Sequence, residues 1–252
     1  MKYQFRAGEL LKKKQPSQIG LEFTSLQRFE LGMPVKIQSG PEEICFVVIR
    51  GVSGFDTGSV KDQASFRDMI YLPRNSNIQL YAVEPGSVVM AYGAPAHRDT
   101  KFAHIHFEEI DQNTHNHKEY GDALNNCHRD VWHYINDDFD ACRLMMGLCR
   151  GDTGGWTSWP PHEHSEEKEE IYTYFNMGDA FGIQCVYEDM ANPIIIALVR
   201  EGDIISIPRG YHPNTGSPAG AISFIYCMVS KKPDDRKFMD LRIQKIYGET
   251  FK

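Results

Sequence analysis

The chain has 252 residues, of which 27 are basic and 34 acidic, so its formal net charge is -7 and its isoelectric point is about 5.8. This balance excludes generic nucleic-acid binding, because no surplus of positive side chains is present to neutralise phosphates. A hydrophobic content of 41% and a charged content of 24% are typical of a globular protein and exclude a disordered or fibrous one.

The sequence also lacks membrane and secretory signals. Its longest apolar runs, residues 44–49 and 193–199, are far shorter than the roughly 20 residues that span a bilayer. The charged first 18 residues contain no apolar core of a signal peptide. The six cysteines show no Cys-x-x-Cys spacing and mostly lie in apolar stretches, which favours buried thiols in a reducing compartment. We therefore expect a cytoplasmic protein that binds neither nucleic acid nor membrane.

Short apolar or alternating runs bounded by Gly, Pro, Asn and Asp recur along the chain and predict an all-β sandwich or barrel. The predicted strands of the first half are 21–31, 43–51, 69–73, 77–83 and 87–94. Those of the second half are 143–149, 155–164, 170–177, 182–187, 194–208 and 221–229. Only residues 9–15 and 233–248 have a helical pattern, the second with Pro and two Asp at its start and Gly248 at its end.

A polar, histidine-rich stretch separates the two halves and predicts a linker or crossover over residues 101–128. The chain then divides into β units of residues 1–100 and 129–252. A weak internal repeat joins them, because YLPRNS and ISIPRGYHP each place Pro-Arg directly after an apolar strand. The first copy has only Asn and Ser where the second has His212, as expected of a duplicated fold with one surviving site.

The densest chemical signal is WTSWPPHEHSEEKEEIYTYF, followed about forty residues later by GDIISIPRGYHPN. On an extended strand His162 and His164 project to the same side, about 6 to 7 Å apart. His212 supplies a third imidazole and SEEKEE a carboxylate, a ligand set that suits a divalent metal ion. Two further His-x-His pairs, His104/His106 and His115/His117, lack this company, and we expect both to be dispensable.

These motifs resemble the two signature segments of the cupin superfamily, with one residue more before His162 and one fewer before His212. The segments WTSWPPHEH, EEIY and IPRGYHP are similar to the 5-deoxy-glucuronate isomerases of inositol catabolism, from about Arg129 onward. The 4-deoxy-5-keto-uronate isomerases are similar through YFNM at residues 174–177. The resemblance implies a bicupin of two tandem β-barrel (jelly-roll) domains with few short helices.

The resemblance implies that residues 1–100 form a degenerate barrel. It implies that residues 129–252 form a barrel that binds one divalent metal ion, with zinc preferred to manganese or iron. The implied activity is an aldose–ketose isomerisation of a deoxy-uronic acid, most simply of 5-deoxy-glucuronate to 5-dehydro-2-deoxy-gluconate. The alternatives are 4-deoxy-5-keto-uronate isomerisation, a non-catalytic sugar-acid-binding bicupin and an oxygen-using cupin. The expected partner is a small sugar acid, and free barrel edges are compatible with a homo-oligomer.

The implied metal ligands are His162, His164, Glu170 and His212. Counting forward from His164 by the general cupin spacing selects Glu169, whereas counting back from Gly178 and aligning the Ile-Tyr strand with the two isomerase families favours Glu170, which we prefer. With Glu170 as the ligand, strand alternation places Tyr172 on the same face. Further expected site residues are Glu169 and Tyr172 as catalytic groups, and Gln184 and Arg209 as contacts to the substrate.

Overall fold

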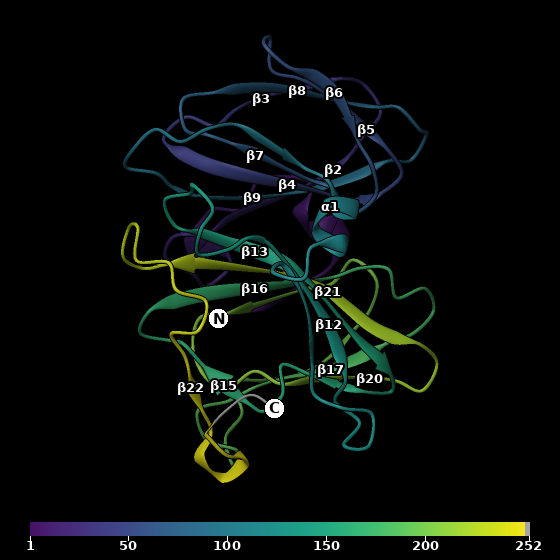
Figure 1. Cartoon of the computed structure of the whole chain (residues 1–252), viewed down its shortest axis with the longest axis vertical. Helices are drawn as coiled ribbons and strands as arrows, with labels where there is room; N and C mark the ends of the chain where they lie inside the picture. Colours follow the sequence, from purple (N-terminus) through teal and green to yellow (C-terminus); the bar gives the residue numbers. More distant parts are fainter. Residues whose placement is uncertain (250–252) are drawn as a thin grey trace.

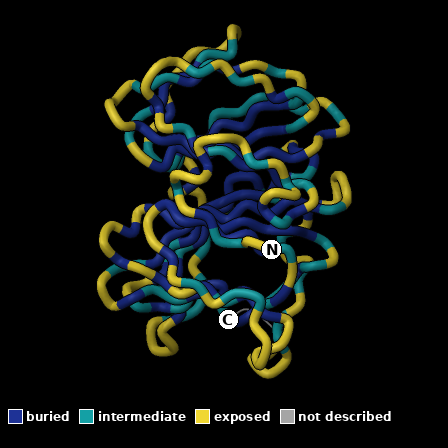
Figure 2. Tube along the Cα trace, turned by 180° about the vertical axis from the view of Figure 1, so that it is seen from behind, coloured by how far each residue is buried: buried dark blue, intermediate teal, exposed yellow. Residues whose placement is uncertain are grey.

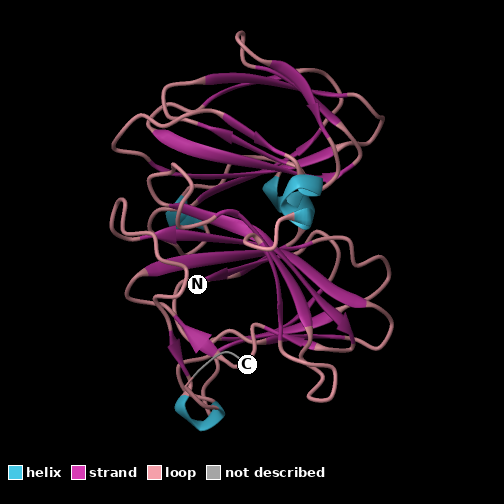
Figure 3. Ribbon diagram, viewed as in Figure 1, coloured by secondary structure: helices cyan, strands magenta, loops and turns pink. Residues whose placement is uncertain are grey.

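The computed structural model describes residues 1–249, and its regular elements are mostly strands joined by loops (Figure 3). Its helical elements, within those residues, are one short α-helix, α1 (Phe107–Gln112), and the 3-10 turns η1 (Ala7–Leu10), η2 (Pro16–Gln18) and η3 (Lys245–Tyr247). Figure 1 shows two β-sandwiches stacked along the long axis, with α1 at the waist between them. The all-β prediction is confirmed, and no helix among the described residues is long and apolar enough to cross a membrane.

The first sandwich pairs a five-stranded sheet, in the order β10-β7-β4-β9-β2, with a four-stranded sheet in the order β3-β8-β5-β6. Its strands are β2 (Ser25–Glu30), β3 (Val35–Gln38), β4 (Glu42–Arg50), β5 (Ser53–Asp56), β6 (Lys61–Ala64), β7 (Met69–Leu72), β8 (Asn77–Ala82), β9 (Val88–Pro95) and β10 (Ala103–Ile105).

The second sandwich contains a seven-stranded sheet, in the order β1-β19-β16-β21-β13-β12-β11, a four-stranded sheet in the order β14-β20-β17-β18, and the pair β15-β22. Its strands are β1 (Gln4–Phe5), β11 (His117–Tyr120), β12 (Arg129–Ile135), β13 (Leu144–Thr153), β14 (Trp156–Thr157), β15 (His162–Glu163), β16 (Lys168–Tyr174), β17 (Gly182–Val186), β18 (Ile195–Val199), β19 (Ile204–Ile207), β20 (Asn214–Gly216), β21 (Ala221–Ser230) and β22 (Arg242–Ile243).

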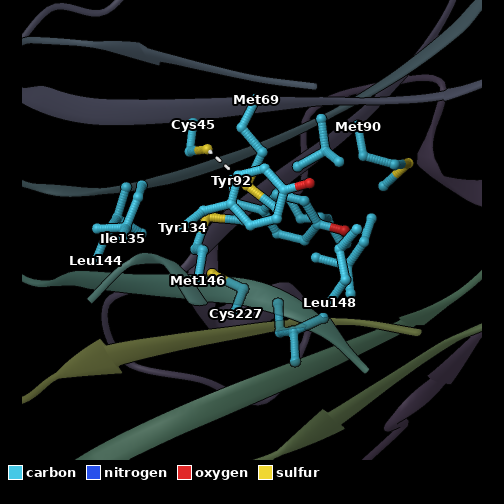
Figure 4. Packing of buried hydrophobic residues seen from close by; sticks show 14 of the residues in the cluster. Cys45, Met69, Met90, Tyr92, Tyr134, Ile135, Leu144, Met146, Leu148 and Cys227 are labelled. Carbon is cyan, nitrogen blue, oxygen red and sulfur yellow. Dashed lines mark hydrogen bonds between the residues drawn. The ribbon is translucent and has the colours of Figure 1, made fainter. Parts of the chain in front are cut away.

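The five-stranded and seven-stranded sheets face one another, so their strands are buried on both faces (Figure 2). On β4, for example, Cys45 and Val47 join the apolar cluster between the sandwiches, while Phe46 and Val48 join the interior of the first sandwich. Figure 4 shows the cluster between the sandwiches, where Met69 and Tyr92 of the first meet Met146 and Cys227 of the second. The two units therefore share a continuous hydrophobic core.

The predicted linker and the predicted helices differ from the structure. Residues 101–128 carry β10, which pairs with β7, and β11, which pairs with β12, so this stretch extends a sheet of each sandwich. The chain start also crosses over, because β1 pairs with β19 of the second sandwich. Residues 9–15 contain only the end of η1, and residues 233–248 contain β22 and η3 in place of a helix.

The six cysteines are free thiols, as predicted, and all but Cys185 are buried.

Candidate metal centre

Strand β16 provides the carboxylate of the centre, and its alternation decides which glutamate points inward. Ile171 belongs to the core between the sandwiches, whereas Tyr172 and Tyr174 belong to the interior of the second sandwich. Glu170, which has the parity of the two tyrosines, therefore points into the second sandwich, where it is 3% exposed. The preferred alignment agrees with this placement.

Three imidazoles gather around Glu170. Its Oε2 lies 3.1 Å from Nε2 of His164 and 3.2 Å from Nε2 of His212. The ligand atoms of these three residues all lie within 4.8 Å of one another. The ring of His162 borders the group, with its centroid 4.7 Å from that of His212 and 6.3 Å from that of His164. The structure thus brings the four predicted ligands together from β15 and its following turn, β16, and the loop between β19 and β20.

Backbone carbonyls orient two of these rings. Nδ1 of His212 lies 2.9 Å from the carbonyl oxygen of Gly210, and Nδ1 of His162 lies 3.0 Å from that of Pro160. A carbonyl only accepts, so each Nδ1 carries the proton and Nε2 presents its lone pair in the neutral ring. Gly210 is needed for this loop, because its φ is +92° and a Cβ there would lie 2.8 Å from the carbonyl oxygen of Tyr187.

The donor set fits a divalent metal ion. In the neutral ring, His212 Nε2 faces Glu170 Oε2 as a second acceptor, without a hydrogen bond between them. Nδ1 of the buried His164 also has no hydrogen-bond partner among the described residues. Buried polar atoms are rarely left so, and a cation among these ligands would remove the repulsion.

The protonation states suit metal ligation. Burial lowers the pKa of His164, and burial together with the neighbouring His212 and His164 lowers that of His162 well below its ordinary value. Burial alone would raise the pKa of Glu170, but the hydrogen bond with His164 outweighs this effect, and the pKa is lowered to about 2. At neutral pH His162 and His164 are therefore neutral imidazoles and Glu170 is an ionised carboxylate, the forms in which these side chains bind metals.

A cavity opens in front of the ligands. Its lining residues are Tyr120, Arg129, Val131, Cys149, Ser158, His162, His164, Glu170, Tyr172, Phe224, Tyr226, Met228, Phe238, Met239 and Leu241. The hydroxyl of Tyr172 lies 2.8 Å from that of Ser158, and its ring centroid lies 5.8 Å from that of His212. Burial raises the pKa of Tyr172 well above its ordinary value, so the phenol keeps its proton and serves as a hydrogen-bond donor.

The C-terminal segment that was predicted as a helix covers this cavity. Phe238, Met239 and Leu241 line it, and Nζ of the buried Lys168 donates to the carbonyl oxygens of residues 237, 238 and 240. A helix would direct those carbonyls to its own amides, so the tertiary contact with Lys168 overrides the local helical preference. We call residues 236–243 the strap.

Glu169 lies on the face of β16 opposite to Glu170. The prediction of a catalytic group at this position is therefore corrected. Its carboxylate accepts hydrogen bonds from the backbone amides of Glu22, Phe23 and Thr24 and from the hydroxyl of Thr24. It therefore joins the second sandwich to the loop before β2 and does not line the cavity.

Gln184 and Arg209 are also not free to contact a substrate as predicted. Nε2 of Gln184 donates to the carbonyl oxygens of Cys185 and His212, at 2.8 and 2.9 Å, and its Oε1 accepts from Tyr174 and Asn214. Its amide thus holds the backbone of His212, a predicted ligand, in place. Arg209 lies on the surface, with 53% of its side chain exposed, and pairs with Glu188 at 2.9 Å.

The sequence reasoning missed Arg129, the cation that does line the cavity. Alternation along RDVWHYI places Arg129 on the same face of β12 as Val131, which packs inside the second sandwich. The sequence could have indicated this residue, because it is a charged side chain on the face of a predicted strand that is otherwise apolar and points inward.

The other His-x-His pairs lie elsewhere. His104 and His106 approach Asp62 at the edge of the first sandwich, while His115 and His117 pair with Asp138 and with Asp111 and Asp130. Neither pair reaches the cavity, and their dispensability stays a prediction.

The chain is similar to several known proteins. The model of the KduI/IolB family matches residues 1–245. The 5-deoxy-glucuronate isomerase of Geobacillus kaustophilus is 23% identical over 223 residues, which cover 81% of this chain and 78% of that protein. The 4-deoxy-L-threo-5-hexosulose-uronate ketol-isomerase of Escherichia coli O9:H4 is 30% identical over 173 residues, which cover 66% of this chain and 58% of that protein.

Solved structures agree on the fold. An IolB-like protein from Salmonella typhimurium LT2 matches with a TM-score of 0.81 at 17% identity, over 98% of each chain. Oxalate decarboxylase from Bacillus subtilis matches with a TM-score of 0.63 at 10% identity, over 90% of this chain and 75% of that chain. The bicupin architecture is confirmed by these likenesses. Because the family model spans almost the whole chain, this protein belongs to the KduI/IolB family.

Proposed function

We propose that this protein is a metal-dependent aldose–ketose isomerase that converts 5-deoxy-glucuronate to 5-dehydro-2-deoxy-gluconate. The observation that carries the proposal is the approach of His212 Nε2 to Glu170 Oε2 at 3.2 Å without a hydrogen bond, beside a cavity that Glu170 and Tyr172 line. Relatives named 5-deoxy-glucuronate isomerase support this substrate, and the relative named 4-deoxy-L-threo-5-hexosulose-uronate ketol-isomerase supports the second candidate.

The chain's residues divide the work of the proposed reaction. His162, His164, Glu170 and His212 hold one divalent ion, with zinc favoured because a set of three imidazoles and one carboxylate suits it, and with manganese or iron as alternatives. Such an ion would supply Lewis-acid polarisation of a carbonyl and its neighbouring hydroxyl. The conversion moves one hydrogen between the two carbons that carry these groups and one proton between their two oxygens.

Tyr172 acts on the substrate oxygens in this scheme. Its phenol keeps its proton because burial raises its pKa, so it donates a hydrogen bond or a proton to an oxygen that gains negative charge. Ser158 orients the phenol from 2.8 Å away. The apolar side chains of the strap, Phe238, Met239 and Leu241, keep bulk water from the reacting carbons.

We assign the reaction to the second sandwich, formed by β1 and β11–β22, and treat residues 1–100 as a degenerate barrel that supports it. A cytoplasmic location agrees with the free cysteines, because reducing compartments keep thiols unpaired. We also predict a homo-oligomer, which a light-scattering measurement of the molar mass in solution would test. Exposed Ile183, Ile196 and Leu198 on the outer face of β17 and β18 offer it an apolar surface.

The test is to strip the purified protein with a chelator, reload it separately with zinc, manganese and iron, and follow both uronates by NMR. We expect conversion of 5-deoxy-glucuronate only by metal-loaded protein, without oxygen uptake at an electrode. Full activity of the metal-free protein would refute the metal-dependent mechanism. Conversion of only the 4-deoxy-5-keto-uronate would reassign the substrate, and binding without conversion of either would indicate a sugar-acid-binding protein.

A further inference from the structure

Arg129 is a buried cation on the wall of the same cavity as the metal ligands. It is the first residue of β12 and is 4% exposed. Arginine is among the side chains least often buried without a charged partner, so its partners decide what it does here.

Those partners are neutral. Nη1 donates to the carbonyl oxygen of Cys127 at 3.0 Å, Nη2 donates to that of Trp159 at 2.6 Å, and the guanidinium carbon lies 5.4 Å from the centroid of the Tyr120 ring. The two hydrogen bonds use two of its five N–H groups. No ion pair joins Arg129 to a carboxylate within residues 1–249, and the adjacent Asp130 contacts His117 at 2.8 Å instead.

A second buried arginine shows what a purely structural role looks like. Arg236 is 8% exposed and donates to the carbonyl oxygens of Asn136, Asp137, Phe139 and Leu144. It is not among the residues that line the cavity. Arg129 differs because it has N–H groups without an acceptor among residues 1–249 and lines the cavity. A buried charge without a charged partner is costly, so a ligand carboxylate there would stabilise it.

The position of Arg129 relative to the reacting groups suits an elongated sugar acid. The carbonyl of Trp159 that holds its guanidinium follows Ser158, whose hydroxyl contacts Tyr172, and Tyr172 lies beside His212. A hexuronic acid carries its carboxylate at the end opposite to the aldehyde that isomerises. The metal ligands and Arg129 thus offer separate partners for the two ends, and a guanidinium fork binds a carboxylate through two parallel hydrogen bonds.

We infer that Arg129 forms the carboxylate subsite of the cavity and selects uronic acids over neutral sugars. This inference rests on the proposed isomerase function and replaces Arg209, the sequence-based candidate, whose guanidinium is paired with Glu188 on the surface.

The experiment compares wild-type protein with R129Q, R129K and the matched charge-removal control R209Q. Steady-state kinetics use 5-deoxy-glucuronate and its neutral counterpart 5-deoxy-glucose, and calorimetry measures binding of D-glucuronate and D-glucose. We expect R129Q to lose roughly 100-fold or more in kcat/KM and affinity for the acids, the usual effect of removing one partner of a buried charge pair, with little change for the neutral sugars. R129K should retain part of the preference, because an ammonium keeps the charge without the fork. R209Q should match the wild type.

Metal content and circular dichroism show whether each variant is folded, and R129K provides the comparison if R129Q does not fold. An R129K variant with the full wild-type preference for acids, or an R129Q variant that loses acids and neutral sugars equally, would overturn the subsite while leaving the isomerase function intact. Arg129-dependent binding of D-glucuronate by a protein that isomerises neither uronate would support the subsite and refute the proposed function. If wild-type protein neither binds nor converts any acid, both are refuted.

Discussion

The two sandwiches have corresponding strands but different interiors. The order β7-β4-β9-β2 in the first matches β19-β16-β21-β13 in the second, and the register Ile44↔Leu72 matches Glu170↔Ile207. Pro-Arg follows Leu72 and Ile207 in turn, which explains the repeat in the sequence.

In the first sandwich, apolar side chains of β4 occupy the positions that correspond to the polar site residues of β16. Ile44 stands where Glu170 does, and Phe46 stands where Tyr172 does. A cavity of about 280 Å³ still borders Ile44 and Phe46, against about 70 Å³ at the metal centre, and no imidazole or carboxylate lines the larger one. The hollow is therefore common to both barrels, and the ligands and the strap belong to the second.

What the two units share on their other face is a pair of buried carboxylates. Glu43 corresponds to Glu169 and accepts hydrogen bonds from the backbone amides of residues 142, 143 and 144, where β13 begins. Glu169 accepts the equivalent bonds from the segment before β2. Each sandwich thus holds the other through one carboxylate, and the position of Glu169 is explained by this symmetry.

The largest effect is expected from His212→Ala, which makes the second barrel resemble the first. Loss of this imidazole should abolish metal binding and reduce activity by more than the roughly 100-fold that loss of an outer metal contact costs. Asn77, at the corresponding place after β7, provides the control, and Asn77→Ala should keep both properties. Metal analysis and NMR turnover measure the pair, and a His212→Ala protein with full metal content would exclude this residue as a ligand.

Tyr172→Phe installs the residue that the first barrel carries at the corresponding position. We expect kcat to fall by about 100-fold, because a positioned proton donor is lost, while the metal content and the fold are unchanged. The control is Tyr211→Phe, since Tyr211 is not among the residues that line the cavity. Unchanged kcat in the Tyr172 variant would leave its hydroxyl without a role in the reaction.

Glu43→Gln and Glu169→Gln should behave alike, because the two carboxylates occupy corresponding positions. Each variant should lower the free energy of unfolding by about 1–3 kcal/mol, since backbone amides lose a charged acceptor. Urea unfolding measures the loss, and the turnover of the folded enzyme should stay near the wild-type value in both. A selective loss of turnover in Glu169→Gln, at equal stability, would restore Glu169 as a catalytic base.

The smallest effect concerns the strap of the second sandwich. Burial would raise the pKa of Glu163, but hydrogen bonds from Arg242 and Ser165 outweigh it and lower the pKa to about 2. This depressed value means that the stabilisation is complete above pH 4.5 and is lost as the pH falls towards 2. Because Arg242 is 42% exposed, we expect Glu163→Gln to cost about 1 kcal/mol or less at pH 7.

Urea unfolding of the wild type and the Glu163 variant at pH 7 and pH 2.5 checks the sign. The difference between the two proteins should be present at pH 7 and should shrink at pH 2.5. A difference that grows on acidification would contradict the ion pair as the source of the stabilisation.

The sequence alone determined the all-β architecture and the repeat, and it predicted four ligand positions through the resemblance to the cupin segments. These properties follow from local pattern, because strand alternation and the His-x-His spacing act within a few residues. The choice of Glu170 over Glu169 came from the spacing to Gly178 and the alignment with the two isomerase families, and the position of Tyr172 inside the second sandwich agrees with it. The helix predicted over residues 233–248 failed because its carbonyls bind Lys168, which lies about seventy residues earlier in the chain.

Tertiary structure decided the functions of the remaining polar residues. Whether Glu169, Gln184, Arg209 or Arg129 faces the cavity depends on partners far away in the chain, such as the amides of residues 22–24 or the carbonyl of Trp159. A sequence records that a side chain is charged, but its partners are set by which strands pair. For that reason the metal ligands were predicted from the sequence, whereas the cation that we assign to the substrate was found only in the structure.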